Sequence, residues 1–214
     1  MTSRPDGNKG EAGGEAMSIS QRAMGFESAY AGAPPWDIGR PQPAFLALAE
    51  RGACQGRVLD IGCGTGEHAL MAAGFGLAAT GIDAAPTPIA LARRKAVERK
   101  LEARFLQWDA LALPLLGEQF DTILDCGLFH VFDDDERARY VESLKAATAP
   151  DGRYYMLCFS DRQPGDWGPR RVTQAEIRAS FATGWNVLSI EESRFDLATG
   201  ADRVVGWLSA IART

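Results

Sequence analysis

Apolar and polar positions alternate along the chain in blocks that predict strands and helices in turn. Short apolar runs typical of buried strands occur at RVLDIG (57–62), LAATGID (77–83), ARFLQWD (103–109), FDTILDCG (120–127) and GRYYMLCFS (152–160). Amphipathic segments of helical length lie at 66–76, 86–101, 133–149 and 172–182. This alternation predicts an α/β fold, a parallel sheet with helices on both faces. Two closing runs, WNVLSIEES and DRVVGWLSAIA, predict a hairpin that makes the last strand antiparallel to its neighbour.

The N-terminal quarter has a different pattern. Residues 1–18 are rich in Gly, Glu and Ser with almost no large apolar side chains, so we expect a disordered tail. Residues 19–53 have helix-like apolar spacing that four prolines interrupt between 31 and 43. We expect these residues to form a helical lid on one globular domain, residues 54–214.

Composition excludes several classes of protein. The chain has 214 residues, and its 23 basic and 28 acidic side chains give a net charge of −5, which disfavours binding to nucleic acid or to an anionic membrane. No apolar run reaches the ~18 residues of a membrane span, and the N-terminus lacks the apolar core of a signal peptide. The four cysteines are widely spaced, as expected for reduced thiols in a cytoplasmic protein.

The most informative motif is V-L-D-I-G-C-G-T-G at residues 58–66. Three glycines at alternate positions follow a buried strand and precede a helix, so a ligand can lie directly against the backbone. The pattern D-x-G-x-G-x-G differs from the G-x-G-x-x-G of dinucleotide sites. Its acidic residue, Asp60, suits a ligand with a cationic ammonium and sulfonium, or else holds the loop through its amides.

Two further carboxylates follow at strand ends. Asp83 comes 21 positions after Gly62, where it can accept hydrogen bonds from both hydroxyls of a ribose, although it can also cap the next helix. Asp109 follows Trp108, where it can accept from an adenine amino group or serve only the turn.

These motifs, in this order over residues 57–160, resemble the class I S-adenosylmethionine-dependent methyltransferases. The resemblance implies a Rossmann-like, seven-stranded, mostly parallel sheet, with S-adenosyl-L-methionine as cofactor and S-adenosyl-L-homocysteine as product. It implies a cofactor site made by Asp60, Gly62, Cys63, Gly64, Gly66, Asp83, Ala84, Trp108, Asp109, Ala110, Asp125 and Cys126.

A narrower resemblance involves A-P-P-W-D-I-G-R-P-Q-P (33–43) and G-P-R-R-V-T (168–173). Both are similar to segments of bacterial small-molecule enzymes of the thiopurine-methyltransferase-like group. The resemblance places Trp36 beside the methionine end of the cofactor, where it helps to close the pocket.

The segment D-C-G-L-F-H (125–130) ends the fourth strand, where the substrate meets the cofactor in this fold class. His130 is a candidate general base because imidazole titrates near neutral pH, and the alternative is a packing role at the next helix. Asp133, Asp134 and Asp135 begin a helix, as the helix dipole favours, so we expect no metal site. The substrate-side candidates are Tyr30, Phe129, Trp167 and Arg170, of which the last two lie in a Gly/Pro-rich segment that is either a lid or a rim loop.

The sequence therefore predicts a cytoplasmic enzyme that methylates an O, N or S atom of a small, aromatic or heteroaromatic molecule. The alternatives are a halide or thiol methyltransferase and a non-catalytic S-adenosylmethionine-binding protein. A nicotinamide oxidoreductase is disfavoured by the glycine spacing. The sequence carries no signal for the oligomeric state.

Overall fold

The structure, a computed structural model, describes residues 24–200 and 204–214. The tail expected at residues 1–18 lies outside the described residues, and so do residues 19–23 of the expected lid. After a helical turn at residues 24–29, the elements follow in the order α2 (Pro43–Glu50), β1 (Arg57–Ile61), α3 (Glu67–Gly74), β2 (Ala78–Asp83), α4 (Pro86–Arg99), β3 (Ala103–Gln107), η1 (Ala110–Leu116), β4 (Phe120–Cys126), η2 (Phe129–Val131), α5 (Asp134–Ala147), β5 (Thr148–Phe159), α6 (Gln174–Ser180), β6 (Trp185–Phe195) and β7 (Val204–Arg213).

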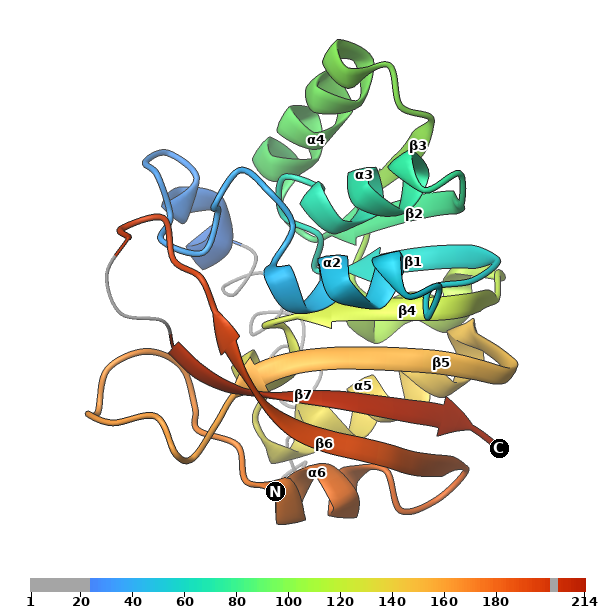
Figure 1. Cartoon of the computed structure of the whole chain (residues 1–214), viewed down its shortest axis with the longest axis vertical. Coiled ribbons are helices and arrows are strands. Elements are labelled where there is room, and N and C mark those ends of the chain that lie inside the picture. The colour runs from blue at the N-terminus through green and yellow to red at the C-terminus, as the bar shows by residue number, and fades with distance from the viewer. Residues whose placement is uncertain (1–23, 201–203) are drawn as a thin grey trace, which may run out of the picture.

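Seven strands form one sheet in the order β3-β2-β1-β4-β5-β7-β6 (Figure 1). The pairs β1–β2, β1–β4, β2–β3 and β4–β5 are parallel, and β7 is antiparallel to both β5 and β6. This confirms the expected mostly parallel sheet with an antiparallel last strand. The strand order reverses between β1 and β4, and ligands of such sheets bind beyond the carboxyl ends of the strands at that point.

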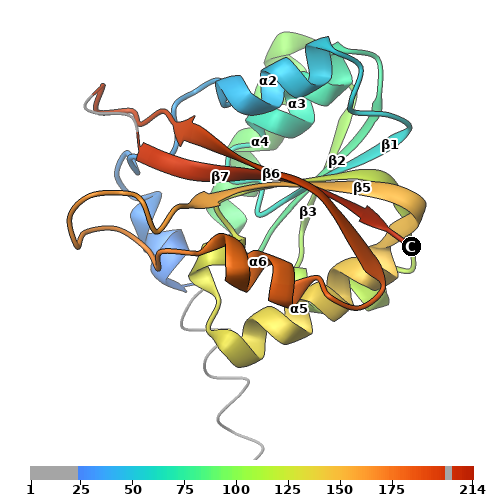
Figure 2. The same ribbon diagram turned by 60° about the horizontal axis from the view of Figure 1, so that its bottom comes forward.

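Helices cover both faces of the sheet (Figure 2). Helices α2, α3 and α4 lie on one face and α5 and α6 on the other. Two apolar clusters fill the layers, one around Phe45, Leu70 and Ile89 and the other around Tyr140 and Ile177. Because β1 is covered on both faces, all of its residues after the first are buried, and all of these except Asp60 are apolar. None of the described helices is long and apolar enough to cross a membrane.

Polar side chains set where two helices begin. A reciprocal capping box joins Asp133 and Glu136 at the start of α5, and a second joins Thr173 and Glu176 at the start of α6. Each box satisfies amide donors that the first helical turn leaves free. The acidic helix start expected at residue 133 is confirmed, and Thr173 caps the helix expected within residues 172–182.

Several element boundaries differ from the prediction by a few residues, and two of these differences have a clear physical cause. The predicted helix 133–149 ends at Ala147, because Thr148 already pairs with Phe120 of β4 and begins β5. The predicted strand 103–109 ends at Gln107, and Asp109 instead caps the short 3₁₀ helix η1. Tertiary pairing decides the first boundary, and side-chain capping decides the second.

Three segments that are distant in sequence meet at one edge of the sheet. In Figure 1 the N-terminal residues 24–42 (blue) and the loop after β5 (orange) lie at the edge toward which β1 and β4 point. The end of β6 approaches the same place, since the Ala198 amide donates to the Pro35 carbonyl at 2.8 Å. These segments enclose the candidate site.

Candidate active site

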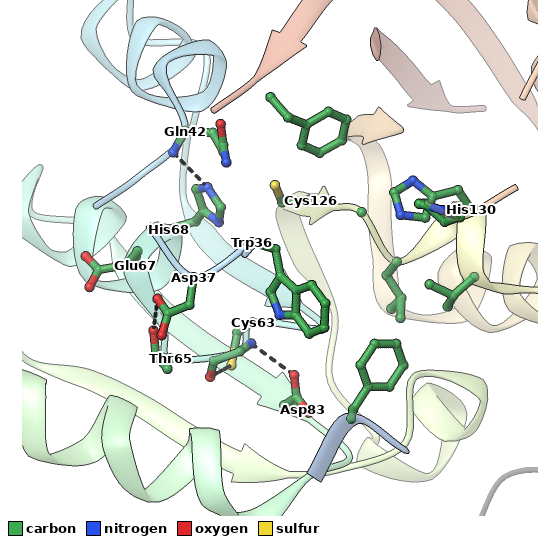
Figure 3. Close-up of a pocket in the computed structure, with 18 of the residues that line it drawn as sticks. Trp36, Asp37, Gln42, Cys63, Thr65, Glu67, His68, Asp83, Cys126 and His130 are labelled. Atoms are coloured by element: carbon green, nitrogen blue, oxygen red, sulfur yellow. Dashed lines mark hydrogen bonds between the residues drawn. The ribbon is translucent and has the colours of Figure 1, made fainter. Parts of the chain in front are cut away.

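A cavity of about 530 Å³ lies beyond the carboxyl ends of the parallel strands. Its walls run from the β2–β3 end of the sheet, at Asp83 and Asp109, to the β5–β6 end, at Phe159 and Phe195. Figure 3 shows side chains from the glycine loop, the N-terminal segment (residues 24–42) and the end of β4 around this space, among them Cys63, Trp36 and His130. The volume is within the range of small-molecule sites.

The three glycines of the loop divide into two groups. Gly62 and Gly64 line the cavity and have φ values of 66° and 51°, which L side chains rarely adopt. Gly66 precedes α3 with φ of 84° and does not line the cavity. A Cβ atom at Gly66 would lie 2.6 Å from the Phe105 ring, so this glycine permits close packing of α3 against β3. The first two glycines thus face the cavity and the third faces the core.

Asp83 joins the end of β2 to the glycine loop. One carboxylate oxygen accepts the Gly64 amide and the other accepts the Ala85 amide, each at 2.9 Å. Burial raises the pKa of this carboxyl above its usual value. Because each carboxylate oxygen can accept more than one hydrogen bond, Asp83 retains acceptor capacity toward the cavity that it lines.

Asp60 lies deeper, below the cavity wall. Its Oδ2 accepts the Ala69 amide at 3.0 Å, and its Oδ1 is buried with no hydrogen-bond partner among the described residues. The nearest basic atom, His68 Nδ1, is 3.8 Å from that oxygen. Asp60 therefore holds the start of α3 and does not line the cavity.

The residues that follow β2 and β3 form the cavity wall at the β2–β3 end of the sheet. Ala84, Trp108, Asp109 and Ala110 all line the cavity. The Trp108 amide donates to the Asp83 carbonyl at 2.9 Å, and Asp109 accepts the Leu111 amide at 2.9 Å as the cap of η1. Asp109 therefore has the turn role that sequence left open, while it also borders the cavity.

The N-terminal segment covers the glycine loop with aromatic rings. Trp36 lines the cavity and donates from Nε1 to the Tyr30 hydroxyl at 3.3 Å. That hydroxyl would be 2.6 Å from a Cβ at Gly64, so the absence of a side chain there lets Tyr30 approach. Burial raises the pKa of Tyr30 above its usual value and keeps it protonated. Sequence analysis predicted both aromatic residues for the site.

Four polar residues that sequence analysis did not select for the site hold this segment in place. The Gln42 side chain exchanges two hydrogen bonds with the Asp196 backbone, at 3.0 and 2.8 Å. The Gln42 backbone amide donates to His68 Nε2 at 3.2 Å. Asp37 accepts from the Thr65 hydroxyl at 2.9 Å. Only the position of Asp37 beside Trp36 could have drawn attention to it, because the other contacts join distant parts of the chain.

A charge network supports the loop from α4. Lys95 donates to Thr65 Oγ1 and to Glu67 Oε1, both at 2.7 Å, and Arg99 donates to both oxygens of Glu67. Burial alone would raise the pKa of Glu67, but the hydrogen bonds from Arg99 and Lys95 hold it below its usual value. Glu67 is therefore ionised and its charge is neutralised.

At the end of β4, neighbouring residues face opposite ways. The Asp125 carboxylate is fully buried and accepts from the hydroxyls of Tyr140 and Tyr154, at 2.8 and 2.6 Å, and from the Leu128 amide. Burial outweighs these hydrogen bonds and raises its pKa to about 6. Cys126 instead lines the cavity, where burial raises the pKa of its thiol and keeps it neutral.

His130 lies in the cavity wall beside two aromatic rings. Its Nδ1 accepts the Phe159 amide at 3.0 Å, and its ring is 5.1 Å from that of Phe159 and 6.2 Å from that of Phe195. Burial, with a smaller effect of the Arg137 charge, lowers its pKa to about 3. The imidazole is therefore neutral at physiological pH.

The remaining substrate-side candidates separate in space. Trp167 lines the cavity and its ring stands at right angles to that of Phe159, with centroids 6.1 Å apart. Phe129 is fully buried against Phe181 and does not line the cavity. Arg170 points elsewhere, to ion pairs with Asp134 and Glu176 at 2.6 Å. The structure brings Trp167 to the site and does not bring Phe129 or Arg170. Across residues 24–200 and 204–214, no group of three or more His, Cys, Asp or Glu could hold a metal ion.

Known proteins resemble this chain over most of its length. Residues 58–152 match a family model described as a methyltransferase domain. The chain is 39% identical over 180 residues to the 2-heptyl-1-hydroxyquinolin-4(1H)-one methyltransferase of Mycobacteroides abscessus, with 79% of each chain covered. It is 27% identical to probable thiol methyltransferase 2 of Arabidopsis thaliana, over 82% of this chain and 79% of the relative. A structure solved for work on the conversion of a disulfide bond into a thioacetal group during echinomycin biosynthesis superposes with a TM-score of 0.82 at 39% identity, covering 89% of this chain and 92% of the other.

Proposed function

Because the chain belongs to the S-adenosylmethionine-dependent methyltransferases, we propose that it methylates an oxygen atom of a small, flat heteroaromatic molecule. The observation that carries this proposal is the two-ended cavity. Asp83 and Asp109 border its β2–β3 end, and the rings of Phe159, Trp167 and Phe195 border its β5–β6 end. Carboxylates suit the cofactor, and a wall of aromatic rings suits a planar acceptor.

The charges around the cavity fit S-adenosylmethionine. Lys95 and Arg99 neutralise the charge of Glu67, and Arg40 pairs with Asp196. Among the described residues that line the cavity, Arg40 is the only lysine or arginine. Asp37, Asp83 and Asp109 also line the cavity and form no ion pair within residues 24–200 and 204–214. An excess of carboxylates favours a cofactor with a sulfonium and an ammonium group over one with a pyrophosphate.

The proposal assigns a position to each part of the cofactor. Asp83 would accept hydrogen bonds from the ribose hydroxyls. The adenine would be held by Ala84, Trp108, Asp109 and Ala110. The backbone of Gly62, Cys63 and Gly64 would lie against the methionine part, with Cys126 and the Asp125 backbone opposite. Trp36 would close the site. This assignment is supported because all of these residues except Asp125 line one cavity. The Asp125 side chain turns into the core, toward Tyr154.

The chain contributes alignment and exclusion of water. S-adenosylmethionine supplies a methyl group on a positively charged sulfur, from which an electron-rich acceptor atom takes it in line. The aromatic rings at the β5–β6 end would orient the acceptor, which raises its effective concentration. Trp36 and Tyr30 would keep water from a reaction in which opposite charges neutralise each other.

Within the family, we place the chain in the thiopurine-methyltransferase-like group. Both motifs behind that resemblance border the cavity, since Trp36 and Asp37 come from the first and Gly168 and Pro169 from the second. The 39% identity to an enzyme named for a hydroxyquinolone favours oxygen as the acceptor atom. A cytoplasmic location without a nucleic-acid partner accords with the net charge of −5 and the four free cysteines.

Sulfur is the second candidate for the acceptor atom. The 39% identity to a chain studied for the conversion of a disulfide bond into a thioacetal group favours it. A thiolate would use the same apolar end of the cavity, so the cavity alone does not separate the two atoms.

Formation of S-adenosylhomocysteine with different acceptors tests the proposal. Hydroxyquinolines, phenols, heteroaromatic thiols and iodide would be assayed separately, with mass spectrometry of the products. We expect hydroxyquinolines to gain about 14 mass units, one CH₂, on oxygen. Methylation of thiols alone would favour the second candidate, and turnover of iodide alone would favour a halide methyltransferase. Tight binding of S-adenosylhomocysteine without any turnover would contradict the proposal and favour a non-catalytic binding protein.

A further inference from the structure

The hydrogen bonds around His130 assign its proton to one nitrogen. A neutral imidazole has one N–H donor and one acceptor nitrogen. Because Nδ1 accepts the Phe159 amide, the proton of the neutral ring is on Nε2. Nε2 has no hydrogen-bond partner within residues 24–200 and 204–214. It lies beside Gly127, where an added Cβ would be 3.4 Å from it, and both residues line the cavity.

We propose that His130 donates a hydrogen bond from Nε2 to an acceptor oxygen that is already ionised, and that it does not act as a general base. This inference rests on the proposed function, because it concerns the acceptor of that same reaction. It replaces the base role for which the sequence made His130 a candidate, since the nitrogen toward the cavity carries a proton and has no free electron pair.

The surroundings of His130 favour this neutral form. From α5, the Arg137 guanidinium lies 4.4 Å above the Phe129 ring and is only 4% exposed. Its Nε and Nη2 atoms have no hydrogen-bond partner in the described part of the chain, and its contact with Glu176 is 3.5 Å long. A second positive charge on the imidazole would be unfavourable beside it, so the pKa of His130 falls to about 3 through burial and this charge.

The other elements around His130 supply no base. Phe159 of β5 and Phe195 of β6 are uncharged, and Cys158 of β5 is a buried thiol whose pKa is raised. On β4, Cys126 is a neutral thiol, and the Asp125 carboxylate is turned toward Tyr140 and Tyr154. With no base beside Nε2, we expect the acceptor oxygen to lose its proton to water before it binds there.

This requirement narrows the acceptor class. The favoured acceptors are planar heteroaromatic hydroxyl compounds, N-hydroxy compounds included, that ionise near neutral pH. In the transfer step, an electron pair of the oxyanion forms the new O–C bond, the pair of the broken S–C bond stays on sulfur, and no proton moves. Buried Arg137 adds a positive potential that favours an anion at this end of the cavity.

Nuclear magnetic resonance of the imidazole nitrogens tests the tautomer without any turnover. The chain contains only two histidines, so an untagged ¹⁵N-labelled protein shows two imidazoles. His68 is the internal control, because its Nε2 accepts the Gln42 backbone amide, so the neutral ring has its proton on Nδ1. A His68→Gln variant assigns the signals. We expect His130 to remain the Nε2–H tautomer from about pH 5 to 8, with and without S-adenosylhomocysteine. An Nδ1–H tautomer, or titration within that range, would overturn the proposal.

The pH dependence of turnover tests the role in catalysis. For two hydroxyquinolines that differ in their own pKa, kcat/KM should rise with pH through the pKa of each acceptor. His130→Phe should lower kcat/KM about 10- to 100-fold without moving that midpoint, since a hydrogen bond to a charged group is lost. His130→Gln should recover most of the loss, because its amide can accept from Phe159 and donate to the acceptor.

The outcomes separate the two proposals. A midpoint that stays at one pH for both acceptors, and that disappears in His130→Phe, would identify His130 as a base and overturn the inference. Failure of every hydroxyl acceptor to react would contradict the proposed function, and the nitrogen spectra would still decide the tautomer of His130.

Discussion

Asp83 illustrates how one residue can organise a site before any ligand binds. Its two oxygens accept the amides of Gly64 and Ala85, so the end of β2 and the glycine loop hold each other in register. The local sequence indicated a carboxylate at a strand end with two alternative roles. The structure shows that Asp83 accepts the Ala85 amide immediately before α4, which has no side-chain cap at its first residues, so Asp83 does not cap that helix; its carboxylate faces the cavity instead.

Asp83→Asn should weaken S-adenosylhomocysteine binding about 10-fold or more. The amide presents one acceptor oxygen in place of two and has no charge, so a charge-assisted hydrogen bond to a ribose hydroxyl is lost. Isothermal titration calorimetry measures the change. Asp135→Asn is the matched control, because it removes the same charge from an exposed position at the start of α5. Equal affinities of the two variants would remove Asp83 from the proposed ribose site.

Gly66 shows that membership of a motif does not define a role. Gly62 and Gly64 line the cavity, whereas Gly66 allows the Phe105 ring and the Ala92 side chain to approach its Cα. An added Cβ would be 2.6 Å from the first and 2.8 Å from the second. We therefore interpret Gly66 as a packing residue between elements, although sequence analysis grouped it with the cofactor site.

Gly66→Ala should lower the free energy of unfolding by about 2–4 kcal/mol, since it combines backbone strain at positive φ with overpacking. Urea unfolding at constant m-value measures it. Gly74→Ala, at the end of α3, is the control, because an added Cβ there meets no atom within 4 Å. That variant should be neutral or up to about 1 kcal/mol more stable. A small effect of Gly66→Ala would show that the loop can shift away from Phe105.

At the scale of elements, the N-terminal segment is attached to the fold by buried polar contacts. Gln42 is 3% exposed and satisfies both backbone groups of Asp196 near the end of β6. Arg40 reaches the Asp196 carboxylate from a half-exposed position. Removing one partner of a buried hydrogen bond costs more stability than removing one partner of an exposed ion pair, because water cannot reach the buried group that remains.

Gln42→Ala should therefore cost about 2–4 kcal/mol of unfolding free energy, and Arg40→Ala about 1 kcal/mol or less. The two variants form a matched pair, since both remove a contact to Asp196. Chemical denaturation gives both values under the same conditions. If Arg40→Ala proved the more damaging of the two, the ion pair would be the main attachment of the segment.

At the scale of the whole molecule, a buried carboxylate makes stability depend on pH. Asp125 connects β4 to α5 and β5 through Tyr140 and Tyr154. Burial raises its folded-state pKa to about 6 from a usual value of 3.8, so the folded protein holds this proton over a range in which the unfolded chain has lost it. Stability from this group is full below about pH 4 and is lost as pH rises through about 6.

The Asp125→Asn variant should lack this component. Relative to the variant, the wild-type protein should lose on the order of 2–3 kcal/mol of unfolding free energy between about pH 4 and pH 6, and nothing further above pH 7. Urea unfolding at half-unit pH steps measures the difference in unfolding free energy between the two proteins. Contributions from the titrating groups that both proteins contain cancel in this difference. A difference that stays constant with pH would show that Asp125 is ionised throughout, with its hydrogen bonds outweighing burial.

The sequence by itself determined the order of strands and helices, the glycine loop and the family. These properties depend on near neighbours: apolar runs mark β1 and β4, and the spacing of Gly62, Gly64 and Asp83 places three cavity-lining residues at adjacent strand ends. The tertiary structure alone decided the insertion of β7 between β5 and β6 and the start of β5 at Thr148, because strand pairing is set by packing and not by local pattern.

The same division holds within the site. Gln42 meets Asp196 from 154 positions away, and His130 meets the Phe159 amide from 29 positions away. Sequence analysis selected His130 from its chemistry, but the location of its proton depends on a backbone amide that only the folded chain brings to it. Local pattern specifies which groups are available, and the three-dimensional contacts specify which of their atoms are free to act.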